Sequence, residues 1–311
     1  MLKKSWKEIM AVFVMAALCV TLLPSPVFAA QLEQTPLDKL VVVEKILYGT
    51  EQTGSLVERT NKLERDLFGR TGKEALMSKV DKIYTYVRET TPAAPSLVFR
   101  LGGLEWSLTQ SVAKGPVLNR LDALEKIVNG ASSAGSIDSR VSRLMSITFS
   151  GGRLQAGQAT LNKDALVKIK LVTSIESKTN RVGDPVEFEV AEDVLASGML
   201  LIPKGAVGIG KLTKVDQAQN FGRDAKIEVN FETVEALDMT KVTTVLGERA
   251  KEETKSMAAA AGAGVAGMIL LGPIGLVGAA FVHGKNITIP AGTLLYIQTQ
   301  SDVELVGMTV K

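Results

Sequence analysis

The chain has 311 residues, of which 46% are hydrophobic and 5% aromatic, and its formal net charge is +3. This length allows two domains, and the near-neutral charge and scarce aromatics argue against a nucleic-acid partner. Cys19 and His283 are the only residues of their types, which excludes disulfides, cysteine or paired-histidine metal sites and a convincing histidine triad. No pair of carboxylates stands out, so we expect no enzyme activity, no metal and no cofactor.

The first residues predict export. The basic start "MLKKSWKE" precedes the apolar run 9–23 and then "PSPVFA". This order is typical of a secretory signal peptide, here 1–29 with cleavage after Ala29. The apolar run is too short for a comfortable membrane span. We therefore expect an exported protein that is periplasmic or associated with the outer membrane.

The region 30–150 consists of six copies of a unit of about 20 residues. The copies share a capping or small first residue, a basic fifth, apolar sixth, ninth and thirteenth residues, and often a tenth Glu and a fifteenth Gly. Apolar residues at these spacings form one stripe of a helix, which Ser begins and Gly ends. The copies begin near Thr35, Ser55, Ala75, Ser96, Pro116 and Ser136.

Each copy therefore predicts a short helix that must bury its stripe against other copies or other subunits. The basic residue and the Glu five places later are expected on a solvated face. This pattern resembles the Leu- and Glu-rich helical repeats of exported proteins of cyanobacteria and of Gram-positive-related diderm bacteria. No functional residue is carried over from that resemblance.

After residue 150 the helical period gives way to alternation of apolar and polar residues. Residues 151–162 predict a linker, and 163–311 contain seven or more short alternating runs such as "LVKIKLVTSI". These runs predict an antiparallel β-barrel or sandwich, so the fold class is α+β. Two Pro-x-Gly turns, at Pro203 and Gly205 and at Pro290 and Gly292, each join two strands, with Gly accepting a positive φ.

One motif in this region comes close to a phosphate-binding loop. Gly205, Gly210 and Lys211 match the beginning of that motif. Leu212 stands where the motif needs Ser or Thr, and the alternation continues as a strand with no helix after it. The sequence therefore predicts no nucleotide binding.

The barrel region resembles a known family. "LVTSIESKTNRVGDPVEFEVAEDVLASGMLLIPKGAVGIGKLTKV" and "ITIPAGTLLYIQTQSDVEL" are similar, in order and turn motifs, to the β-barrel of TrbI-type proteins of conjugation and type IV secretion. The resemblance implies a barrel in the cell envelope. It also implies a hydrophobic helical insertion that lines an outer-membrane opening.

The stretch 257–282 has no charged side chain. The strands predicted on its two sides belong to one sheet, so the stretch must leave and return on the same side. Gly272 and Pro273 divide it into parts too short to cross about 30 Å of hydrocarbon. We predict an apolar Gly/Ala-rich helical hairpin, which either covers an open end of the barrel, dips into a membrane or assembles into a ring. The residues expected to allow close helix packing are Gly262, Ala266, Gly267, Gly272, Pro273, Gly275 and Gly278.

These observations predict a non-enzymatic structural or assembly protein of the cell envelope. Its helical repeats would bind an envelope protein or another copy of the chain, and 257–282 would make any membrane contact. The alternative function is a channel or secretion-complex subunit whose hairpin inserts into the outer membrane. We expect protease to cut between Ser150 and Lys163 and to leave a resistant β fragment.

Overall fold

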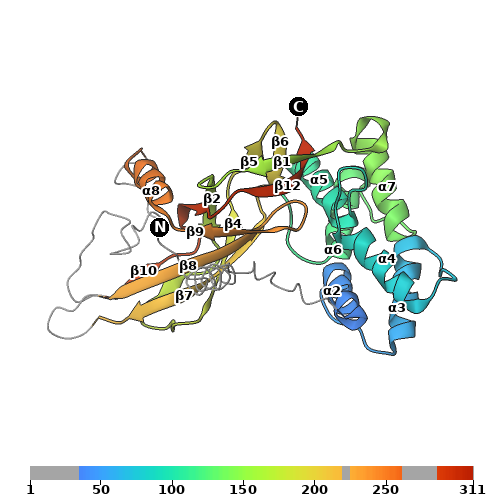
Figure 1. Cartoon of the computed structure of the whole chain (residues 1–311), viewed down its shortest axis with the longest axis horizontal. Helices are drawn as coiled ribbons and strands as arrows, with labels where there is room; N and C mark the ends of the chain where they lie inside the picture. Colours follow the sequence, from blue (N-terminus) through green and yellow to red (C-terminus); the bar gives the residue numbers. More distant parts are fainter. Residues whose placement is uncertain (1–34, 219–224, 261–285, 311) are drawn as a thin grey trace, which may run out of the picture. The chain divides into compact units, whose positions relative to one another are not determined.

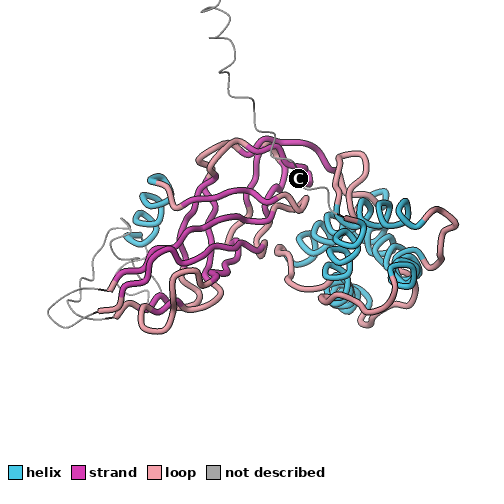
Figure 2. The backbone as a smooth tube through the Cα atoms, turned by 60° about the horizontal axis from the view of Figure 1, so that its bottom comes forward, coloured by secondary structure: helices cyan, strands magenta, loops and turns pink. Residues whose placement is uncertain are grey.

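A computed structural model describes residues 35–218, 225–260 and 286–310. Residues from Pro36 onward belong to one compact unit. Helices come first in this unit and strands follow, as the colours of Figure 1 show, and Figure 2 marks the two kinds of element. The strands are antiparallel, so the predicted α+β class is confirmed. The predicted signal peptide 1–29 lies outside the described residues, and so do all seven residues proposed for hairpin packing.

One helix forms in each of the six predicted repeats. Ser55, Ser96 and Ser136 each accept a hydrogen bond at Oγ from the backbone N–H three residues later, as N-caps do. Gly69 and Gly130 end their helices with φ of 75° and 80°, a conformation that side chains other than Gly disfavour. The helices are α2 (Pro36–Tyr48), α3 (Leu56–Phe68), α4 (Leu76–Arg88), α5 (Leu97–Thr109), α6 (Val117–Asn129) and α7 (Ile137–Thr148).

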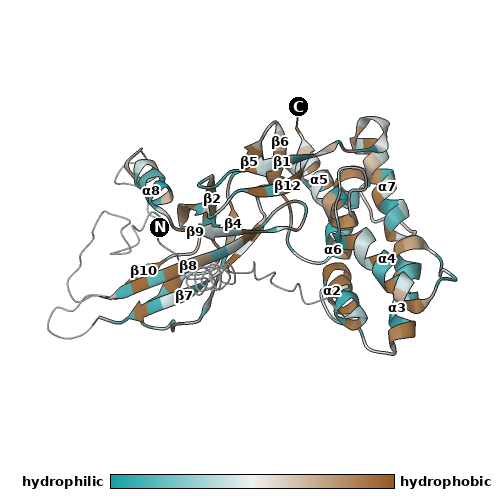
Figure 3. Cartoon of the chain, in the orientation of Figure 1, coloured by the Kyte–Doolittle hydropathy of each residue, from teal (hydrophilic) through white to brown (hydrophobic). Residues whose placement is uncertain are grey.

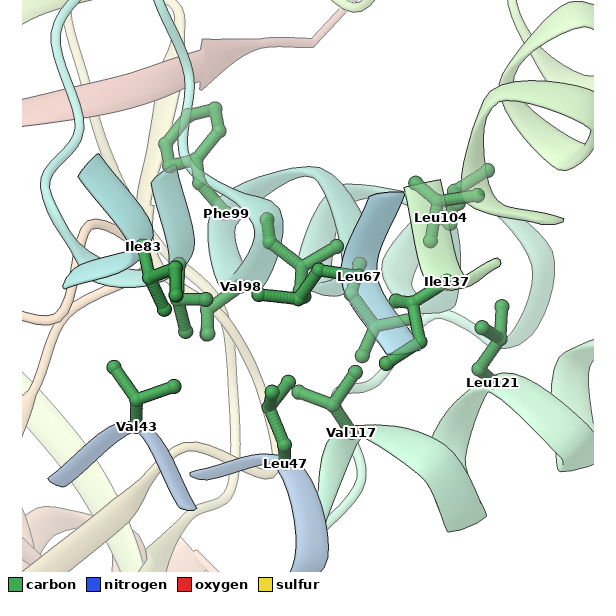
Figure 4. Packing of buried hydrophobic residues seen from close by; sticks show 14 of the residues in the cluster. Val43, Leu47, Leu67, Ile83, Val98, Phe99, Leu104, Val117, Leu121 and Ile137 are labelled. Carbon is green, nitrogen blue, oxygen red and sulfur yellow. The ribbon is translucent and has the colours of Figure 1, made fainter. Parts of the chain in front are cut away.

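The predicted apolar stripe of each helix forms the helical core. Every side chain at the sixth and ninth repeat positions is buried. Figure 4 shows residues of all six helices meeting in this core, and Figure 3 shows the polar faces that the same helices keep. The sixth and ninth positions are Leu40, Thr60, Val80, Leu101, Leu121 and Val141, and Val43, Leu63, Ile83, Leu104, Leu124 and Leu144.

Strands follow from residue 156 onward, and six of them close a barrel in the order β11-β2-β4-β7-β8-β9. All neighbouring strands in the barrel are antiparallel. The remaining strands form a four-stranded sheet, β1-β12-β6-β5, and the pair β10-β3. The strands are β1 (Ala156–Leu161), β2 (Leu166–Leu171), β3 (Ile175–Glu176), β4 (Pro185–Val190), β5 (Val194–Ala196), β6 (Met199–Ile202), β7 (Val207–Asp216), β8 (Lys226–Glu235), β9 (Lys241–Val245), β10 (Thr288–Ile289), β11 (Leu294–Thr299) and β12 (Val303–Thr309). Helix α8 (Glu248–Ala260) lies between β9 and β10 in the chain.

Large apolar side chains fill the interior of the barrel. Phe188 of β4 and Phe231 of β8 are buried and meet edge to face, with ring centroids 5.5 Å apart. Alternate residues of β2, β4 and β8 join them in one buried cluster, to which β7 contributes Leu212. Small barrels of this kind hold a packed core rather than a water-filled lumen.

The expected linker 151–162 contains a strand, so that part of the prediction is wrong. β1 pairs with β12 along its whole length, from Ala156 opposite Met308 to Leu161 opposite Val303. Its neighbour Leu154 belongs to the same buried cluster as the helical core. The connection between the repeats and the strands is therefore shorter than the sequence indicates.

Candidate functional site

Helix α8 completes the barrel where two strands lose contact. β9 and β11 pair only at Gln298 opposite Val245 and Thr299 opposite Thr244. Farther along β11, the N–H of Tyr296 donates to Oγ1 of Thr254 in α8, at 2.9 Å. The N–H of Ala250 donates to Oε1 of Gln298, at 3.1 Å. α8 thus covers the edge of β11 that β9 leaves open, and it includes the first residues of the apolar stretch, 257–260.

The chain returns to the barrel at Asn286. Oδ1 of Asn286 accepts a hydrogen bond from the N–H of Ala218, at 3.3 Å, and one from Oγ of Ser177, at 3.4 Å. Ser177 also exchanges hydrogen bonds with the backbone of Ile287, at 2.9 and 3.0 Å, and β10 then pairs with β3. The apolar stretch is therefore attached on one side to barrel strand β11, through α8, and on the other side to residues that follow β3 and β7.

The two Pro-x-Gly turns share one backbone geometry. Gly205 and Gly292 have φ of 87° and 84°. In each turn the N–H of the residue after Gly donates to the carbonyl of Pro203 or Pro290, at 3.1 and 3.3 Å. A Cβ on Gly205 would also lie 2.2 Å from the carbonyl oxygen of Val112, whereas no atom lies within 4 Å of one on Gly292. The turn at Gly205 thus depends on Gly for close contact as well as for φ.

The part that resembles a phosphate loop is an ordinary barrel strand. Gly208 and Gly210 lie in β7, where a Cβ on Gly208 would be 2.0 Å from the Phe188 ring. A Cβ on Gly210 would be 2.4 Å from the carbonyl oxygen of Asn230. Lys211 pairs with Glu232 across the strands. Barrel packing therefore requires Gly208 and Gly210, and this requirement explains the partial match to a phosphate-binding loop.

Buried ion pairs join consecutive repeats. Arg59 donates from Nε and Nη2 to the two oxygens of Glu44, at 2.9 and 2.6 Å, and the N–H of Gln52 donates to Oε2 of the same carboxylate, at 3.0 Å. The acid is at position ten of one repeat and the base at position five of the next, 15 residues later. The arrangement, including the loop N–H, recurs in Glu64–Lys79, Glu105–Arg120 and Glu125–Arg140.

The prediction that these charges lie on a solvated face is therefore wrong. All four Glu residues are at most 2% exposed. Within one repeat the basic residue and the Glu are five places apart, which separates their directions on a helix, so each finds its partner in a neighbouring repeat. The recurring acid-to-base spacing of 15 was visible in the sequence and would have identified the pairs.

The junction between the third and fourth repeats differs from the others. Tyr84 stands in place of the Glu, and Arg100 instead donates to the hydroxyl of Tyr86, at 2.7 Å, and lies 3.5 Å from the carboxylate of Asp138 in α7. The Tyr86 hydroxyl donates to the same Asp138 oxygen, at 2.5 Å. Nε of Arg100 is buried with no hydrogen-bond partner among the described residues.

Within 35–218, 225–260 and 286–310, no group of three His, Cys, Asp or Glu side chains is placed to hold a metal ion. In those same ranges, no helix has the length and apolar character needed to cross a bilayer.

Comparisons with known proteins identify no family. No family model and no curated protein matches the sequence. Among solved structures, the chain is similar to ComB10 of the Com type IV secretion system of Helicobacter pylori. The match covers 46% of this chain and 88% of that chain, at 16% identity and a TM-score of 0.27. Values this low assign neither a fold nor a function.

Proposed function

We propose that the chain is a non-enzymatic structural or assembly protein of the cell envelope. Its repeats bind an envelope protein or a second copy, and its barrel presents the apolar stretch 257–282 to a membrane or to other copies. The observation that supports this most is the double attachment of the stretch, through Thr254 on one side and Ser177 on the other. An uncharged stretch of this size needs an apolar partner, because soluble monomers rarely expose such a surface.

Export is part of the proposal. The basic start, apolar run and "SPVFA" of 1–29 support it. Sequencing of the N-terminus of the exported protein should begin at Ala30 or close to it. A mature protein that retains the apolar run would make that segment an anchor and contradict the proposed export.

A channel or secretion-complex subunit is the second candidate. It is favoured by the motifs around Pro203 and Pro290, which resemble those of TrbI-type barrels. The filled barrel interior restricts this candidate, since Phe188 and Phe231 occupy the space that a pore would need. An opening would have to be formed by apolar stretches from several copies.

The test compares the full chain with a variant in which 261–282 is replaced by a short Gly/Ser linker. α8 and β10 stay in place, so the barrel should remain folded by circular dichroism. Envelope fractionation followed by cross-linking mass spectrometry should place the full chain with envelope neighbours and the variant largely in the soluble fraction. Rings that require detergent would favour the channel. A full chain that is soluble, monomeric and without envelope neighbours would contradict both candidates.

A further inference from the structure

A cleft of about 750 Å³ lies on the repeats, between α3, the α3–α4 loop, α4 and the start of α7. Its size is within the usual range for a ligand site. Phe68 lines the cleft and packs edge to face on Tyr86, with centroids 4.9 Å apart. Arg70 and Lys73 line it from the loop. The cleft thus combines an aromatic side chain with two loop cations, and Lys82 of α4 lines it as well.

The acids that line the cleft are already matched within the chain. Glu64 binds Lys79 at 2.9 Å, and Glu74 binds Lys82 at 3.1 Å. Asp138 accepts from Tyr86 and faces Arg100. Arg70 and Lys73 are exposed and form no ion pair with any residue of the described ranges. The uncompensated charge of the cleft is therefore positive.

The other repeats show that this charge is not required by the fold. The α6–α7 loop has Ala131 and Ala134 where the α3–α4 loop has Arg70 and Lys73, and both loops end their helices with Gly in the same conformation. Asn129 occupies the place of Phe68. The same helix ending and loop therefore form both with the basic and aromatic side chains, after α3, and without them, after α6.

We infer that this cleft binds an acidic peptide segment of a partner protein that also carries an aromatic or large apolar residue. Carboxylates of the peptide pair with Arg70 and Lys73, and its apolar side chain packs on Phe68. Charge-assisted contacts of this kind combine affinity with selection of the partner. The inference rests on the proposed role of the repeats in interaction and specifies the chemistry of the partner.

The probe is a short fluorescent peptide that alternates glutamate with phenylalanine, titrated into the full chain and followed by anisotropy. We expect binding that weakens about tenfold or more when Arg70→Ala and Lys73→Ala are combined. The matched control combines Lys163→Ala and Lys241→Ala, which removes the same charge from exposed sites elsewhere and should leave binding unchanged. Phe68→Asn, checked for folding by circular dichroism, should also weaken binding.

Three results would overturn the inference. The first is no binding by the full chain, and the second is equal binding by the Arg70 and Lys73 double variant. The third is equal binding of a peptide with serine in place of phenylalanine, which would indicate a site for any polyanion, such as an acidic glycan. If the protein cross-links to envelope neighbours but fails this test, the proposed function stands and only the inference of an acidic partner is rejected.

Discussion

The buried carboxylates at the repeat junctions are expected to be among the most sensitive residues of the chain. Glu125 is 1% exposed and accepts hydrogen bonds from Arg140 and from the N–H of Ser133. Glu125→Ala leaves the buried Arg140 charge with only the half-exposed carboxylate of Asp122 as its partner, so the change should cost up to about 3–5 kcal/mol. Urea unfolding followed by circular dichroism should show this loss. Glu74→Ala, which breaks an exposed and solvent-screened pair, should cost much less, and equal losses would contradict the prediction.

The same residue predicts how stability changes with pH. Burial raises the pKa of the Glu125 carboxyl, but the hydrogen bonds from Arg140 and Ser133 outweigh burial and lower the pKa. A lowered folded-state pKa gives stability that is complete above the unfolded value of about 4.3 and is lost as pH falls through the folded value. We expect Glu125→Gln to be less stable than the natural chain at neutral pH, by a margin that shrinks as the pH falls below about 4. A margin that is constant with pH would show that the charge of Glu125 does not contribute.

Gly208 is required by the packing of the barrel core. A Cβ there would overlap the ring of Phe188, which is held against Phe231. Gly208→Ala should cost about 1–3 kcal/mol in unfolding free energy, as overpacking does, and Phe188→Leu should restore part of the loss. Gly157→Ala is the control, because its Cβ would meet only the flexible end of Met199. A larger loss in the control would contradict this account.

At the residue scale, the sequence predicted glycines that a turn requires, but it did not predict a glycine that core packing requires. The positive φ expected at the two Pro-x-Gly turns is present at Gly205 and Gly292. Gly208 fits no turn motif, because its role depends on a ring that comes from β4. Such a contact joins residues far apart in the chain and leaves no local signal.

At the scale of elements, helix α8 is the least expected part of the barrel. Its first half carries most of its charged residues, and only Ala250 and Thr254 are buried. Thr254→Val keeps the shape of the side chain and removes the acceptor of the Tyr296 N–H. Hydrogen exchange of the Tyr296 amide should become faster, and stability should fall by about 1 kcal/mol because a half-buried donor loses its partner. Thr213→Val, on an exposed part of β7, should leave that amide unchanged, and an unchanged rate in Thr254→Val would show that α8 does not protect β11.

Elements with a regular period were predictable, and elements that depend on a distant partner were not. The helices begin within one or two residues of the predicted copies because caps and stripe are local. β1 was taken for a linker because its sequence, "AGQATL", has few residues that favour strands. Its structure comes from pairing with β12, almost 150 residues later in the chain.

At the scale of the whole molecule, the repeats and the strands share a core. Leu200, Leu237 and Met308 belong to the same buried cluster as the helices. The indole N–H of Trp106 in α5 donates to Asp193, at 2.8 Å. If a protease site is placed after Ser150 and cut, the two fragments should remain together in gel filtration without denaturant. Fragments that separate and stay folded would show that the two halves are independent.

Because α8 and β10 are both attached to neighbouring strands, the length and sequence of the chain between Ala260 and Asn286 can be changed at low cost to the fold. α8 is held by barrel strand β11 and β10 is held by β3, so the main cost of a flexible replacement is the entropy of closing a loop. That entropy grows with the logarithm of length, and doubling the length costs about 0.6 kcal/mol. We therefore expect the fold of this chain to tolerate a replacement of different length or hydropathy at this position. The site is accordingly a suitable place to insert a fluorescent or affinity domain into this protein.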